Sequence, residues 1–62
     1  GWRPEADGKW YYYTGGNRKT GWVETDGVWY YLDPSADGAM VSGTSMVIDG
    51  VSYEFDGSGA MM

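Results

Sequence analysis

The sequence predicts an all-β fold in which tandem β-hairpin repeats stack as a short solenoid and end in a degenerate C-terminal capping hairpin. The 62-residue chain contains three similar segments about twenty residues apart, a spacing typical of solenoid repeats. Each segment has an Asp-Gly pair between two runs rich in β-forming residues, which indicates a hairpin with a tight turn. No segment shows the apolar periodicity of a helix.

The second copy fixes the pattern most clearly. A two-residue turn at Asp26-Gly27 places Trp22 opposite Tyr31. Because side chains alternate along a strand, Trp22 and Trp29 then share one face and Tyr30 lies on the other. The hairpin therefore presents a Trp pair on one side and a single Tyr on the opposite side.

The first copy has one extra residue before its Asp-Gly pair. A two-residue turn would place Trp2 and Trp10 on opposite faces. A three-residue loop, Ala6–Gly8, with Gly8 in the left-handed conformation, restores them to one face. Tyr11 then points the other way.

The third copy keeps the scaffold but has Ser45 and Ser52 at the two Trp positions. The corresponding face is mostly polar, and the other face is wholly apolar. The apolar side chains are Met46, Ile48, Val51, Tyr53 and Phe55. A polar outer face and an apolar inner face are what a terminal repeat needs, so we expect no ligand site after this copy.

The repeats divide the chain into residues 1–20, 21–43 and 44–62, joined by turn-rich linkers at 14–17 and 33–38. All three are expected to form one domain. Since the chain starts inside a repeat, we expect it to be a piece of a longer protein.

Aromatic residues dominate the apolar content: four Trp, six Tyr and one Phe against a single Leu and a single Ile. Each ring can bury about 150–250 Å², so the sequence predicts a core built from rings. Without Cys or His, neither a disulfide nor a Cys/His zinc site can support it.

The nine acidic and four basic residues give a net charge of −5. Nucleic acid is not an expected partner, because phosphate binding needs a clustered basic face. A cationic ligand suits this charge better. No apolar stretch reaches membrane-spanning length, so no membrane insertion is expected. No cofactor or metal motif is present, and without His or Cys no nucleophile–base pair can be assembled, so no catalytic residue is predicted.

The pattern resembles the choline-binding repeat of bacterial and phage cell-wall proteins. In that family Gly-Trp is followed by Gly-x-Trp-Tyr-Tyr and then by Gly-x-Met-x-x-Gly. The matching segments are Gly21-Trp22, Gly27–Asp33 and Gly38–Gly43. The first copy matches in its hairpin and the third only in its scaffold, so the resemblance covers essentially the whole chain.

The resemblance implies a choline held between consecutive repeats, by two Trp from one hairpin and an aromatic from the next. The residues implied for the first site are Trp2, Trp10 and Tyr30. Those implied for the second site are Trp22, Trp29 and Tyr53, with Met40 at the side. Arg18 stands where the first site would carry its Met, and its charge is expected to weaken binding of a cation there. Packing roles are assigned to Tyr11, Tyr12, Tyr31 and Phe55.

The implied function is a non-catalytic cell-surface anchoring module that binds choline on teichoic acid or a similar wall polymer. Its implied location is extracellular, at a bacterial cell wall or surface, or on a phage lysin acting at the wall. A separate hydrolase elsewhere in a longer protein is compatible with this role.

Two other functions stay open at the level of sequence. Related aromatic repeats bind carbohydrate, so a glucan is the alternative ligand. A structural spacer or a homotypic assembly module with weak self-association is the second alternative, since stacked hairpins can pair through their open ends.

Overall fold

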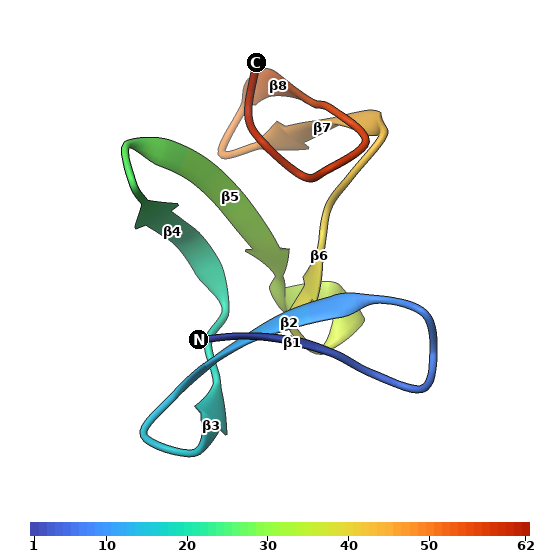
Figure 1. Ribbon diagram of the computed structural model, residues 1–62. Helices are drawn as coiled ribbons and strands as arrows, with labels where there is room; N and C mark the ends of the chain where they lie inside the picture. Colours follow the sequence, from blue (N-terminus) through green and yellow to red (C-terminus); the bar gives the residue numbers. More distant parts are fainter.

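The computed structural model describes residues 1–62 as three antiparallel units without an α-helix (Figure 1). The first unit contains β1 (Trp2–Pro4), β2 (Trp10–Thr14) and β3 (Asn17–Arg18). The second contains β4 (Gly21–Thr25), β5 (Val28–Asp33) and β6 (Ala39–Met40), with a short 3-10 helix, η1 (Pro34–Ala36), before β6. The third contains β7 (Thr44–Ile48) and β8 (Val51–Phe55). The prediction of an all-β hairpin fold is confirmed. The structure contains no helix that could span a membrane.

The second hairpin has the predicted register. Trp22 lies opposite Tyr31, and Glu24 lies opposite Trp29 across β4 and β5. The turn residues Asp26 and Gly27 both have positive φ angles, 52° and 79°, as a type I′ turn requires. Trp22 and Trp29 therefore share a face.

The first hairpin closes through the predicted three-residue loop. Trp2 lies opposite Tyr12 and Pro4 opposite Trp10, and the amide of Glu5 donates to the carbonyl of Lys9 at 3.0 Å. Gly8 has a φ angle of 80°, the left-handed conformation that such a loop needs. The extra residue is absorbed in the loop, and the strands keep their alternation.

The third hairpin shows the predicted division of its two faces. Ser45, Ser52 and Glu54 are exposed, whereas Ile48 and Phe55 are buried. The prediction fails at Val51, which is 52% exposed. Val51 flanks the turn opposite the buried Ile48, so only one of the two residues beside this turn is covered.

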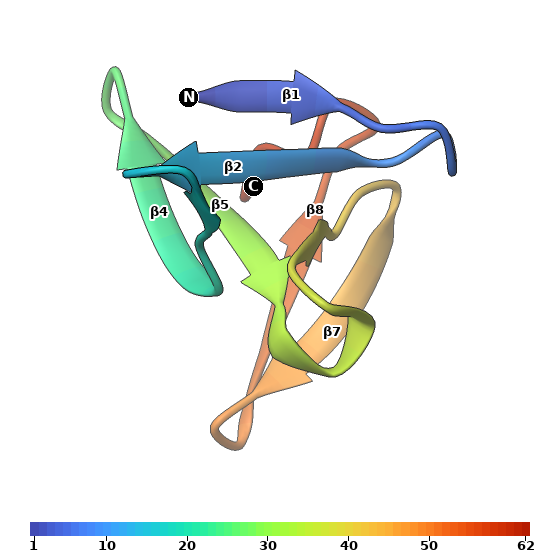
Figure 2. The ribbon, with the colours of Figure 1, turned by 90° about the horizontal axis from the view of Figure 1, so that it is seen from below.

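The turns of the three hairpins point in three different directions around a common axis (Figure 2). The buried apolar residues are Tyr11, Val23, Leu32, Ala39, Ile48 and Phe55. The prediction of a core built from rings is therefore wrong in part: only two of these residues are aromatic. The other four are aliphatic, whereas most of the eleven aromatic side chains are partly or fully exposed.

Two loops repeat the same polar turn. The Asp33 carboxylate accepts hydrogen bonds from the amide and the hydroxyl of Ser35, at 2.9 and 2.7 Å. Asp56 accepts from the amide and the hydroxyl of Ser58 at the same distances, and also from the amide of Ala60. Each turn sends the chain back along its own hairpin, so the third unit has a returning segment that the sequence analysis did not anticipate.

Candidate ligand-binding site

Trp22, Trp29, Tyr53 and Met61 line an open cavity of about 250 Å³ at the seam between the second and third hairpins. The Trp22 and Tyr53 ring centroids are 4.9 Å apart at an interplanar angle of 72°. Those of Trp22 and Trp29 are 6.2 Å apart at 86°. We call these four residues the second cluster; its walls are entirely apolar.

A matching arrangement lies between the first and second hairpins. Trp2, Trp10, Tyr30 and Met40, the first cluster, line a cavity of about 620 Å³. The Trp2 and Tyr30 centroids are again 4.9 Å apart at 72°. The remaining lining residues are Gly8, Ser42, Gly57 and Ser58. Two independent seams thus build the same ring geometry, and the first has a polar rim.

The hairpin alternation explains how each cluster forms. Trp22 and Trp29 lie on one face of their hairpin, while Tyr30 lies on the other and lines the cavity that contains Trp2 and Trp10. One hairpin therefore contributes a Trp pair to one seam and a Tyr to the preceding seam. The structure brings together the predicted Trp and Tyr residues of both sites.

Met40 lies at a different seam from the one predicted. It lines the first cluster with Tyr30, and Met61 takes the corresponding place in the second cluster beside Tyr53. The physical reason is strand pairing: the returning segment pairs with its own hairpin, so that Met40 lies opposite Leu32 and carries its side chain to the preceding seam.

Met61 is the site residue that the sequence analysis missed. A signal for it was present, because the segment Asp56–Met61 repeats Asp33–Met40 with two residues fewer. In both segments an Asp starts the turn and Ala-Met ends it. Met61 forms a bridge with Phe55, as Met40 pairs with Leu32.

Arg18 does not line the first cluster, contrary to the expectation that its charge would disturb that site. Its guanidinium carbon lies 3.8 Å from the ring centroid of Tyr11, on the side of the first hairpin that faces away from the Trp pair. Arg18, like Met40, pairs with its own hairpin and therefore lies one seam earlier than the sequence analysis expected. The first cluster has no charged side chain in its lining.

The aromatic residues assigned to packing support the Trp rings or fill the core. Tyr11 and Phe55 are buried. Tyr12 contacts Trp2 edge-on at 5.1 Å, and Tyr31 contacts Trp22 at 5.0 Å. These contacts hold one Trp of each pair while the other remains open to solvent.

The groups whose pKa the fold shifts are not members of either cluster. The Tyr11 hydroxyl, which donates to Asp7, lowers the pKa of that carboxyl group, and the Ser58 side chain lowers the pKa of Asp56. No group of three or more His, Cys, Asp or Glu side chains is placed to hold a metal ion. The cluster residues themselves present ring faces and methionine side chains.

Comparison with known proteins identifies the family of these repeats. The family described as choline-binding repeat matches residues 19–62. The chain belongs to the choline-binding repeat family. No curated protein sequence matches the chain.

Several solved structures resemble this family member along its whole length. The choline-binding domain of Spr1274 from Streptococcus pneumoniae is 36% identical, with a TM-score of 0.89 over 100% of this chain and 91% of that one. Choline-binding protein F from the same organism is 31% identical, with a TM-score of 0.86 over 100% of this chain. The pneumococcal cell wall endolysin from phage Cp-1, complexed with choline, is 33% identical, with a TM-score of 0.86 over 98% of this chain.

The chain spans only 21% of choline-binding protein F and 18% of the endolysin. It matches a small part of those longer proteins and nearly all of the Spr1274 choline-binding domain. The predicted family is confirmed.

Proposed function

We propose that this module binds choline in both aromatic clusters and thereby attaches to a choline-decorated polymer of a bacterial cell wall. The observation that carries the proposal is the repeated cluster itself. Two Trp, a Tyr and a Met meet at each seam, with the same 4.9 Å and 72° relation between Trp and Tyr. The Cp-1 endolysin complexed with choline, which shares this fold, supports the choice of ligand.

The chemistry of choline suits such a cluster. Its quaternary ammonium carries a full positive charge but has no N–H to donate, so hydrogen-bond acceptors recognise it poorly. The negative face of a ring attracts it by about 0.5–2 kcal/mol, with Trp the most favourable. Burial of the methyl groups adds a hydrophobic contribution. A single site of this kind is expected to bind in the range of about 1 mM.

The wall polymer and the extracellular location follow from this ligand. The Cpl-1 endolysin, complexed with a peptidoglycan analogue, is 33% identical to this chain, and it supports a role at the cell wall. The module itself has a binding role and no catalytic one, and any hydrolase would be a separate part of a longer protein. Since one site is weak, firm attachment depends on several sites engaging one polymer.

A titration with choline chloride, followed by Trp fluorescence and by thermal unfolding, tests the proposal, with matched NaCl as the control. We expect a saturable response to choline that NaCl does not reproduce. The W29A variant should lose the part due to the second cluster and keep the part due to the first. An identical response to choline and NaCl would refute choline binding.

A glucan is the second candidate ligand, and the first cluster provides the observation in its favour. Its cavity is the larger one, and Ser42 and Ser58 lie on its rim. Sugars stack on Trp faces and need polar groups around them for their hydroxyls. A titration with a soluble glucan that changes the fluorescence of the wild type but not of W10A would support this candidate.

A further inference from the structure

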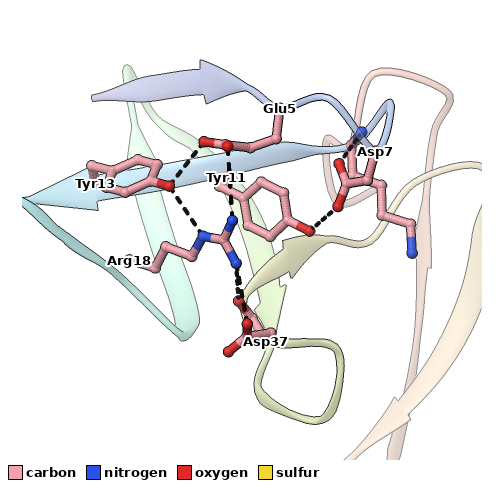
Figure 3. Close-up of polar contacts among 7 residues, drawn as sticks. Glu5, Asp7, Tyr11, Tyr13, Arg18 and Asp37 are labelled. Atoms are coloured by element: carbon pink, nitrogen blue, oxygen red, sulfur yellow. Dashed lines mark hydrogen bonds and ion pairs between the residues drawn. The ribbon is translucent and has the colours of Figure 1, made fainter.

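Arg18 is held against Tyr11 by an extensive set of contacts (Figure 3). Its guanidinium carbon lies 3.8 Å from the Tyr11 ring centroid, and its Nε donates to the Tyr13 hydroxyl at 3.1 Å. Glu5 lies 3.8 Å and Asp37 3.2 Å from its terminal nitrogens. An aromatic face and two carboxylates thus surround one cation.

Arg18 occupies the position that methionine holds in the other two repeats. It pairs with Tyr13, as Met40 pairs with Leu32 and Met61 with Phe55.

The next repeat packs on this position in the same way. Gly38 lies against Arg18, since a Cβ on Gly38 would be 3.7 Å from the Arg18 Cβ. Gly59 lies against Met40 in the equivalent manner. The equivalence of Arg18 and Met40 therefore extends beyond the strand register to the loop of the following repeat.

Tyr11 is likewise the counterpart of Tyr30. Each directly follows the second Trp of its hairpin, and each points away from the Trp pair. Tyr30 is partly exposed at the first cluster, whereas Tyr11 is only 3% exposed. In the first repeat, Tyr11 and Arg18 therefore stand at the positions of the Tyr and Met of a ligand site. The Tyr11 ring is already covered.

We propose that Arg18 is an internal cation that takes the place of the ligand at Tyr11 and closes this face to choline. The inference rests on the proposed function, which gives the ligand its quaternary ammonium. A tethered cation has a high effective concentration at its ring, and the carboxylates of Glu5 and Asp37 favour its charge further. Free choline that binds an open site at about 1 mM cannot compete with it.

The direct test adds a repeat ahead of the chain, so that the Trp pair of the added repeat faces Tyr11. A copy of residues 21–43 is joined ahead of Gly1, so that Gly43 precedes Gly1 as it precedes Thr44 in the chain. Choline is then titrated into the extended chain carrying ring-labelled Tyr, with the spectra recorded by NMR. We expect the Tyr30 and Tyr53 signals of the original repeats to shift and the Tyr11 signal to stay. The R18M substitution in the extended chain should make Tyr11 shift as well.

A second variant tests the same idea without any extension. The M61R substitution introduces an arginine into the second cluster at the register position of Arg18. Its control is M62R, which adds the same charge at the neighbouring residue, 77% exposed and outside the cluster. We expect the choline-dependent shift of Tyr53 to be lost in M61R and retained in M62R, with Tyr30 responding in both.

The outcomes separate this inference from the proposed function. A Tyr11 signal that shifts with choline in the extended chain while Arg18 is present would overturn the inference, as would a Tyr53 signal that still shifts in M61R. In either case the responses of Tyr30 and Tyr53 in the unsubstituted chain would leave the proposed function intact. If neither of those signals responds to choline, both proposals fall together.

Discussion

Trp10 and Trp29 are 44% and 41% exposed, although the chain has only one Leu and one Ile with which to build a core. Each is the outer member of its Trp pair, and its partner is held by a tyrosine contact, Trp2 by Tyr12 and Trp22 by Tyr31. A half-exposed Trp adds less to folding than a buried one, so its ring remains available to a ligand.

This exposure leads to a prediction for W29A. Loss of one ring removes about 1–2 kcal/mol of cation–π attraction, and 1.4 kcal/mol corresponds to about tenfold in affinity. We expect choline affinity at the second cluster to fall by about tenfold or more, with a cost in stability well below the roughly 3–5 kcal/mol of a buried Trp. Isothermal titration and chemical denaturation measure the two effects.

The matched variant W10A should weaken the first cluster alone. A W29A protein that binds choline as well as the wild type at both clusters would contradict the assignment of Trp29.

Tyr11 and Asp7 form a hydrogen bond whose contribution depends on pH. The Tyr11 hydroxyl, followed by the Lys9 amide, lowers the pKa of Asp7 from its ordinary 3.8, and Asp7 raises the pKa of Tyr11 above its ordinary 10.0. The contribution of Asp7 to stability is present above pH 3.8 and is lost as the pH falls through its lowered pKa. That of Tyr11 is present below pH 10 and is lost as the pH rises through its raised pKa.

We therefore expect Y11F to unfold at a lower temperature than the wild type at pH 7, with a difference that shrinks at strongly acidic pH and above pH 10. Thermal unfolding from pH 2.5 to 11 measures this difference. Y12F, whose ring has no such carboxylate partner, is the control. A difference between Y11F and wild type that is constant across this range would rule out the role of the pair.

At the scale of elements, the loop from Asp56 to Met61 holds the third repeat against the second. Gly59 has a φ angle of 91°, and a Cβ at this position would lie 2.5 Å from the sulfur of Met40. An alanine at such a φ costs roughly 1–3 kcal/mol. Because Met40 lines the first cluster, the substitution acts on a site built by the two preceding hairpins.

G59A is thus expected to lower the free energy of unfolding by about 1–3 kcal/mol and to weaken choline binding at the first cluster. G57A is the matched control for stability in the same loop, since a Cβ on Gly57 meets nothing within 4 Å. Denaturation of both variants and a choline titration of G59A against the wild type check the prediction. Equal stability of G59A and G57A would show that the contact with Met40 does not constrain the loop.

The register of the hairpins could be predicted from the sequence, but the places of Met40 and of the loop from Asp56 to Met61 could not. The hairpins could be predicted because an Asp-Gly turn and strict alternation fix the register of Trp22 and Trp29 without any distant contact. The seam at which Met40 lies depends on how far each returning segment reaches across the stack, which spacing along the chain does not determine. The length change between Asp33–Met40 and Asp56–Met61 also concealed the third returning segment.

The whole molecule has few buried residues, eight of 62, as expected of a chain too short to bury most of its surface. Both clusters lie between hairpins and not within one: Tyr30 of the second hairpin meets Trp2 of the first, and Tyr53 of the third meets Trp22 of the second. A ligand in either cluster therefore contacts two repeats at once. Choline should act as an added connection between the units of the solenoid, and its binding should be coupled to their stacking.

This coupling predicts a large thermal stabilisation by choline. At ten times the dissociation constant, each site contributes about 1.4 kcal/mol to the folded state. Two sites together raise the unfolding temperature of a domain of this size by roughly 10–20 °C. Scanning calorimetry at increasing choline concentration, against matched NaCl, measures the shift, and W10A and W29A should each keep about half of it. A full shift in both variants would mean that choline stabilises the chain without occupying the clusters. Each substitution removes a Trp from a different cluster, so neither variant could keep the full shift in unfolding temperature if choline bound at both.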